Sequence, residues 1–352
     1  MSSNRYLNKI EMTISAFALA GTVLCVTPEA QAHCPAFGGG IGIAGPITTF
    51  SAATLPEGKG VLGIRAEYTR FDALSADELS RIVMDGQTGH SLKNQLVYSL
   101  GGAYGIGDDL TVGLSLPYVQ RDGIQAVHFD QDMGMSMQHD IGSSNGLGDL
   151  TLFGQYRLLR KLYEGIDLSL IAGLKAPTGA TGNTSNGARV ETEHQPGSGS
   201  WDPIVGVALS KRIERLTLHA SGLYTVTTDG AQSTDLGNRA QASLAAAYRF
   251  GGKENYGDCD EIYEYFYPES RARWLGDLVL ELNGQWQDRM KVSGVSDAST
   301  GGTVLYLSPG ARVSFDGKYS ASLSVGVPVY QNLHGNQSEV DYRLVAGVAV
   351  AF

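Results

Sequence analysis

After its first 32 residues, the sequence lacks any apolar run of the roughly 18 residues that a membrane-spanning helix needs. Proline and cysteine are also scarce, with 11 and 3 residues among 352. Basic residues are too few to balance the acidic ones, and the formal net charge of −10 argues against nucleic acid as a partner. Helical membrane proteins and nucleic-acid-binding proteins are therefore disfavoured, and a hydrophobic content of 42% must be accommodated in another kind of structure.

Residues 1–32 have the pattern of a secretory signal peptide, which we expect to be removed. Arg5 and Lys9 precede an apolar stretch at 13–26, and small residues at 30–32 fit a cleavage site. An exported chain without a spanning helix is either soluble or a β-barrel.

Twelve later segments alternate apolar and polar residues with the period of a β-strand, and they have about the length that a membrane-spanning strand needs. These segments are about 61–71, 95–106, 110–119, 148–159, 166–176, 202–211, 216–226, 239–250, 277–287, 304–315, 319–330 and 341–352. Strands in lipid must pair all their backbone groups, so a set of them has to close on itself. The pattern predicts an all-β, transmembrane antiparallel β-barrel of about 12 strands over residues 60–352, in the cell outer membrane.

The connections between these segments alternate in length, which supports the prediction. Most odd-numbered segments are followed by long polar stretches and most even-numbered ones by short turns, as in barrels with external loops and periplasmic turns. The last segment alternates up to Phe352, like the closing strand of a bacterial outer-membrane barrel. A secreted β-sandwich would also alternate, but the strand lengths and the loop asymmetry count against it. Residues 33–59 fit either a periplasmic tail or a plug inside the barrel.

Nine charged residues fall on the inward-facing positions of the predicted strands. They are Arg65, Glu67, Arg157, Lys175, Arg239, Arg249, Glu281, Arg312 and Arg343. In a channel they would line the solute path and set its selectivity. In a narrow barrel they would instead pair with one another as a packed interior. The two interpretations are compatible, and the sequence leaves both open.

The segment after the third strand combines thioethers with imidazoles. It contains His128, Met133, Met135, Met137 and His139, and thioethers suit Cu(I). An alternative function is therefore copper or silver binding at this external loop, to which the histidines at 33, 90, 194 and 334 would contribute. The simpler interpretation is a mobile loop whose methionines make adaptable apolar contacts.

Two cysteines, Cys34 and Cys259, remain once the signal is removed, and both fall on the periplasmic side of the predicted topology. In an oxidising compartment they predict a disulfide. Two free thiols, or a metal-binding terminus formed by Cys34 and His33, are the alternatives.

His219 and Ser221 lie two residues apart on the seventh strand, and they resemble the catalytic pair of the outer-membrane phospholipase. A serine nucleophile needs a base within hydrogen-bond reach, and in that enzyme the pair faces lipid. Here the apolar residues at 216, 218 and 220 take the lipid face, so we expect His219 and Ser221 to point inward. A lipid-modifying enzyme is thus the third hypothesis, and we expect the protein not to be an enzyme. We also expect no cofactor, because the glycine-rich stretch at 40–45 lacks the strand and helix of a dinucleotide site.

Four stretches resemble the outer-membrane transporter family named for the MetA pathway of phenol degradation. They are the lead-in from Ala44-Gly45-Pro46-Ile47 to Leu55-Pro56, Gly148-Asp149-Leu150-Thr151-Leu152, Leu174-Lys175-Ala176-Pro177-Thr178-Gly179, and Ser200-Trp201-Asp202-Pro203. The resemblance implies an outer-membrane channel for passive passage of small solutes, including apolar or aromatic ones. Its partners would be outer-membrane lipid and a small-molecule solute, with a metal ion under the alternative hypothesis. The oligomeric state stays open.

Overall fold

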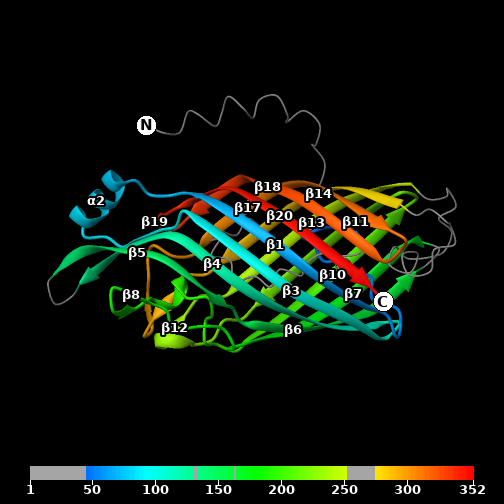
Figure 1. Ribbon diagram of the computed structural model, residues 1–352, viewed down its shortest axis with the longest axis horizontal. Helices are drawn as coiled ribbons and strands as arrows, with labels where there is room; N and C mark the ends of the chain where they lie inside the picture. The colour runs from blue at the N-terminus through cyan, green and yellow to red at the C-terminus, as the bar shows by residue number, and fades with distance from the viewer. Residues whose placement is uncertain (1–44, 131–133, 162–163, 252–273) are drawn as a thin grey trace, which may run out of the picture.

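The computed structural model describes residues 45–130, 134–161, 164–251 and 274–352. Twelve long strands form a closed antiparallel barrel (Figure 1). They are β1 (Gly60–Asp72), β3 (Asn94–Gly107), β4 (Leu110–Asp130), β6 (Leu150–Lys161), β7 (Ile166–Ala176), β10 (Asp202–Ile213), β11 (Leu216–Thr225), β13 (Arg239–Phe250), β14 (Trp274–Gln287), β17 (Gly302–Phe315), β18 (Tyr319–Leu333) and β20 (Glu339–Ala351). Each strand pairs with the barrel strands before and after it in the chain, and β1 pairs with β20 to close the ring. The predicted fold is confirmed.

Alternation along the strands separates an apolar outside from a polar inside. Outward side chains such as Leu62, Leu100, Leu280, Leu323 and Val348 are exposed, as expected for residues that face lipid. The residues between them are buried, and on β18 these are serines. The interior is therefore filled by polar and charged groups. Helices of the described residues are all too short or too polar to cross a membrane.

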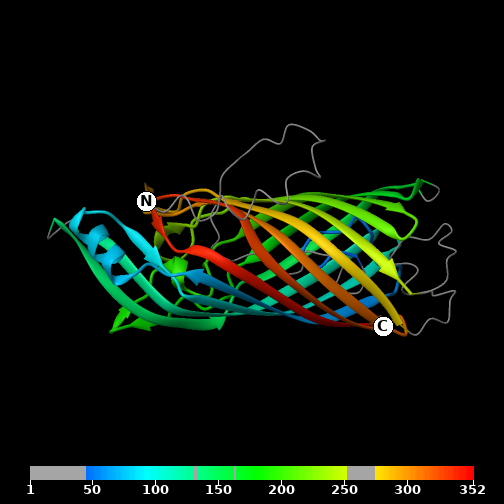
Figure 2. The same ribbon diagram turned by 90° about the horizontal axis from the view of Figure 1, so that it is seen from above.

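The two ends of the barrel differ. The C-terminus lies at the end with the short turns, which is the periplasmic end in outer-membrane barrels. At the other end lie α2 and the short loop strands (Figures 1 and 2). The elements outside the ring of twelve strands are α2 (Ala76–Met84), β2 (Gly89–Ser91), β5 (Met135–Leu147), β8 (Thr184–Ser185), β9 (Ala188–Arg189), the 3₁₀ helices η4 (Thr192–His194) and η5 (Ala231–Ser233), β12 (Thr234–Asp235), β15 (Lys291–Val292), β16 (Val295–Ser296) and β19 (Asn336–Gln337).

One external connection has more regular structure than the sequence analysis predicts. β4 continues to Asp130, and its outer half pairs with β5, so the Met/His segment is a β-hairpin and not a loop. Helix α2 covers this hairpin, and its Leu79 and Ile82 pack against Val127. A capping box starts the helix, with the Ser75 hydroxyl accepting a hydrogen bond from the Glu78 backbone N–H. The hairpin and helix extend the barrel wall on the external side.

Residues 45–59, which we call the strap, cross the barrel interior before β1 begins. Their contacts run in chain order from β17 and β14, across to β10, β7 and β6, and then to the turn between β3 and β4. Leu55 is fully buried near the periplasmic end, against Val61 and Ala103. Residues 45–59 thus lie inside the barrel, whereas residues 33–44 lie outside the described residues, and the choice between tail and plug for the whole segment 33–59 stays a prediction.

Candidate functional site

The strap is held mainly by one carboxylate of the barrel wall. Glu281 on β14 accepts hydrogen bonds from the backbone N–H groups of Ile47, Thr48 and Thr49, at 3.2, 3.0 and 2.9 Å, and from the Thr48 hydroxyl at 2.6 Å. Successive backbone N–H groups that converge on one anion form a nest. Because Glu281 is only 1% exposed, these donors replace its lost hydration.

Arginines of the same wall hold the start of the strap from the other side. The Arg312 guanidinium donates to the carbonyl oxygens of Gly45 and Pro46, and Arg65 donates to that of Ile47. The N–H groups of the strap thus donate to a carboxylate of the wall, and its carbonyl oxygens accept hydrogen bonds from arginines of the wall. The strap occupies the lumen as a hydrogen-bonded element and does not merely fill space.

The other predicted lumen residues are buried or nearly so, and most have acidic partners. Arg249 Nε lies 2.8 Å from Asp277 Oδ1, Arg157 Nε lies 3.0 Å from Asp109 Oδ1, and Arg65 Nη2 lies 2.9 Å from Glu67 Oε2. Arg343 approaches Glu67 at 4.0 Å and stacks over the Tyr306 ring at 4.1 Å. Arg239 is also buried. The paired interior expected of a narrow barrel is therefore present.

Three of the stretches that carry the family resemblance meet around Lys175. Its ammonium lies 2.5 Å from Asp202 Oδ2, 3.4 Å from Asp149 Oδ2 and 2.5 Å from the Ser198 hydroxyl. The backbones of two of the stretches touch here as well, because a Cβ on Gly179 would lie 2.7 Å from the Gly148 carbonyl carbon. This buried cluster joins β6, β7 and β10 at their external ends. Three stretches that are far apart in the sequence therefore contribute to one structural feature. Asp149, Asp202 and Asp277 were not predicted as site residues, although Asp202 opposes Lys175 and Asp277 opposes Arg249 in the strand register.

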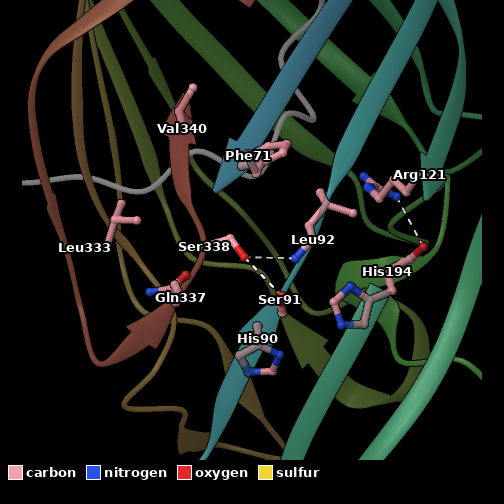
Figure 3. Close-up of a pocket in the computed structure, with 10 residues that line it drawn as sticks. All are labelled: Phe71, His90, Ser91, Leu92, Arg121, His194, Leu333, Gln337, Ser338 and Val340. Carbon is pink, nitrogen blue, oxygen red and sulfur yellow. Dashed lines mark hydrogen bonds between the residues drawn. The ribbon is translucent and has the colours of Figure 1, made fainter. Parts of the chain in front are cut away.

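A pocket opens among the external ends of the strands (Figure 3). Its wall is apolar at Phe71, Leu92, Leu333 and Val340 and polar elsewhere. The polar lining consists of His90, Ser91, Arg121, His194, Gln337 and Ser338. The four apolar residues also pack against buried Val304 and Tyr306, so the pocket is a small cavity in the packed external end of the barrel.

Histidines and acids from separate loops converge beside this pocket. His90 Nδ1 lies 3.3 Å from Glu193 Oε1, and His194 Nε2 lies 3.8 Å from the same oxygen. The His128 ring stands 5.5 Å from that of His90, between centroids, and its Nε2 lies 2.9 Å from Glu191 Oε1. The ligand atoms of His90, Glu193 and His194 lie within 4.8 Å of one another.

The electrostatics of this cluster are unusual for external loops. Burial lowers the pKa of His90, but the hydrogen bond to Asp297 and the charges of Glu193 and Asp297 outweigh it and raise the pKa to about 9. Burial raises the pKa of Glu193 to about 6. Burial also raises the pKa of Asp297, but His90 and other hydrogen bonds outweigh it and lower the pKa to about 2. For His194, burial and the nearby His90 and Arg121 cations all lower the pKa.

The register of β4 and β5 keeps most of the predicted Met/His residues on one face of the hairpin, with Met137 directly opposite His128. His128 and His139 remain together, with ring centroids 6.1 Å apart. Met135 is 54% exposed, Met137 is half-buried opposite His128, and Met133 lies outside the described residues. Copper or silver binding by these thioethers stays a prediction.

The other predicted sites can be placed more briefly. His219 and Ser221 are both buried on the inward face of β11, and His219 Nδ1 is hydrogen-bonded to the Ser210 hydroxyl at 2.8 Å. This is the inward orientation expected from the sequence. Cys34 and Cys259 lie outside the described residues, and so does the predicted signal at 1–32.

A closed twelve-stranded barrel with an apolar outer face and a charged interior defines an outer-membrane β-barrel protein. Residues 86–258, slightly less than half of the chain, match the model of the family described as "Putative MetA-pathway of phenol degradation". The match confirms the family resemblance that the sequence indicates.

Among solved structures, the COG4313 outer membrane channel from Pseudomonas putida F1 is 17% identical, with a TM-score of 0.56 over 86% of this chain and 98% of that one. LpxR from Salmonella typhimurium is 11% identical, with a TM-score of 0.40 over 82% of this chain and 99% of that one. The Pseudomonas putida toluene transporter TodX is 11% identical, with a TM-score of 0.36 over 89% and 98%. No curated protein sequence matches the chain. The first of these likenesses supports the barrel fold.

Proposed function

We propose that this protein is an outer-membrane channel for the passive passage of small solutes, including apolar and aromatic ones. The observation that carries the proposal is the closed barrel with an apolar outer face and a polar interior, and the small external pocket beside Phe71, Leu92, Leu333 and Val340 supports it. A solute held there would lose its water before it enters the barrel. The family description, which refers to phenol degradation, supports the same class of solute.

Below the pocket, the solute would pass the paired charges and the strap. Neutralised pairs such as Arg249 and Asp277 leave few isolated charges in its way. The strap narrows the periplasmic half and is held by hydrogen bonds to charged wall groups, each of which contributes about 1.5–3 kcal/mol. Passage therefore depends on how the strap moves, and the protein acts without catalysis. We assign no catalytic role to His219 and Ser221.

The first test is conductance and flux with the refolded mature chain. In a planar bilayer we expect discrete single-channel steps that change in Arg157→Ala and Arg312→Ala variants, because both side chains lie in the lumen. In liposomes we expect phenol to enter faster than into protein-free vesicles.

The pocket is tested by Leu92→Ser/Leu333→Ser, which makes its wall polar, with the exposed external residue change Val295→Ser as the matched control. We expect phenol influx to fall several-fold in the double variant and to be unchanged in the control. A correctly folded barrel that gives neither steps nor influx would refute the channel, and equal influx in the double variant would refute the role of the pocket.

A further inference from the structure

Three ligand-type atoms face one another in the external cluster without hydrogen bonds. They are His90 Nδ1, Glu193 Oε1 and His194 Nε2; none of them makes a hydrogen bond in the described part of the chain, and His90 Nδ1 meets Glu193 Oε1 only at the ion-pair distance of 3.3 Å. The three residues are only 3–4% exposed. Buried polar atoms without partners are rare, and each needs an explanation such as an ion.

The spacing of these atoms fits the first shell of a metal ion. Zn²⁺ binds nitrogen and oxygen ligands at about 2.0–2.2 Å in tetrahedral geometry, so its ligand atoms lie roughly 3.3–3.5 Å apart. The observed distances from Glu193 Oε1 are 3.3 Å to His90 Nδ1 and 3.8 Å to His194 Nε2. The ligand atoms of all three residues lie within 4.8 Å of one another, so an ion between them needs only local movement of the side chains.

The outer shell of the cluster is also that of a metal site. Asp297 Oδ2 bonds His90 Nε2 at 3.1 Å, which is the carboxylate–histidine arrangement that orients metal-binding imidazoles. Asp297 is itself fixed by the Ser299 N–H at 2.8 Å. On the other side, Arg121 donates to the carbonyl oxygens of His194 and Gln195, at 3.2 and 2.8 Å, and holds the η4 turn in place.

We propose that His90, Glu193 and His194 bind a divalent transition-metal ion of the Zn²⁺ type, with a water in the fourth position near His128. Imidazole with carboxylate suits such ions, whereas Cu(I) prefers the soft sulfur ligands and Mg²⁺ or Ca²⁺ prefer all-oxygen sites. The site is distinct from the predicted thioether site, because none of its three ligands is a methionine.

The proposed metal would link three external loops and one wall of the pocket. His90 belongs to the connection after β1, Glu193 and His194 to that after β7, and Asp297 to that after β14. His90 and His194 also line the pocket (Figure 3). The ion would therefore fix the shape of the external opening. This inference goes beyond the proposed channel and does not depend on it.

The test is metal binding by the refolded, tag-free mature chain, measured by calorimetric Zn²⁺ titration after chelator treatment and by the visible spectrum with Co²⁺ alone. We expect one high-affinity ion per chain and the absorption bands of tetrahedral Co²⁺. The triple variant His90→Ala/Glu193→Gln/His194→Ala should lose this ion. Asp297→Asn should keep the stoichiometry but bind about 10–100-fold more weakly, as outer-shell changes do.

The control is His334→Ala, which removes a half-buried external histidine that is not among the three ligands. It should bind the ion as the unmodified chain does, and all variants should show the heat-modifiable gel mobility of a folded barrel. No ion in the unmodified folded chain would overturn the proposal. Equal affinity in the folded triple variant, or loss of the ion in three single Met→Ser variants at 133, 135 and 137, would overturn it as well.

Discussion

Glu281 is the residue on which the position of the strap depends most. Its carboxylate accepts four hydrogen bonds from three consecutive strap residues, and the Glu281 side chain is buried. A glutamine of the same shape would still accept through its one oxygen, but its amide would place a donor against the strap N–H groups. The negative charge, and not the size of the side chain, is therefore what selects the strap conformation.

We expect Glu281→Gln to lower the free energy of unfolding by about 1.5–3 kcal/mol, the range for a hydrogen bond to a charged group. The loosened strap should also give larger single-channel steps. Chemical denaturation and planar-bilayer recordings measure the two effects. Glu339→Gln, at an exposed position of β20, is the control and should change neither quantity. Unchanged steps in Glu281→Gln would show that the strap does not limit the pore.

The charged residues of the interior also show which properties of a single residue its sequence position predicts. All nine inward cations and anions were found from the period-two pattern, because a strand fixes which face each side chain takes. Apart from Glu67, their acidic partners were not found, since Asp277 opposes both Arg249 and Arg312 only once the register of three strands is known. Alternation predicts the face of a residue, and register determines its partner.

Among the elements, the strap is the one whose motion the proposed function requires. Ser51 on the strap and Ser210 on β10 place their hydroxyl oxygens 3.4 Å apart, so cysteines at these positions can be joined with little displacement. The lumen strap would then be tied covalently to the barrel wall.

In a Cys34→Ser/Cys259→Ser background, we expect Ser51→Cys/Ser210→Cys to conduct in smaller or fewer steps when oxidised. Reduction with dithiothreitol should restore the steps, because the strap is then held only by hydrogen bonds. Ser51→Cys alone, treated in the same way, should not respond. Identical recordings before and after reduction, with the cross-link proven by mass spectrometry, would mean that solutes pass a static strap.

The elements differ in how well the sequence predicts them. Each of the twelve spanning strands was predicted within a few residues, apart from β4, because lipid on one side imposes strict alternation. Helix α2 was missed although Ser75 and Glu78 form a recognisable capping box. The sequence analysis named His90, His128 and His194 as possible contributors to one external metal site, but it did not find Glu193 or Asp297, because no local pattern reveals how the external segments pack.

The whole molecule combines a pocket at the external end, an interior of paired charged side chains, and a strap in the periplasmic half. The cluster at Lys175 and the proposed metal both brace the external loops, while Glu281 and Arg312 brace the strap. The barrel is thus the frame, and under the proposed function the parts that control passage are the external pocket and the strap that starts near its middle. Such a division places stability in the strands and function in the loops and the strap.

Substitutions on the outer face of the barrel test whether the barrel spans a membrane. Leu280 lies halfway along β14 and is 50% exposed, whereas Trp274 begins the strand and is 62% exposed. If the outer face lies in a bilayer, an arginine near the midplane costs about 2–4 kcal/mol and one near the interface about 0–1 kcal/mol. We therefore expect Leu280→Arg to reduce the unfolding free energy in lipid vesicles much more than Trp274→Arg. In a water-exposed strand both changes would be nearly neutral, so equal small effects would contradict the membrane-spanning arrangement. A loss of unfolding free energy that grows from the interface to the midplane is what distinguishes a bilayer from water.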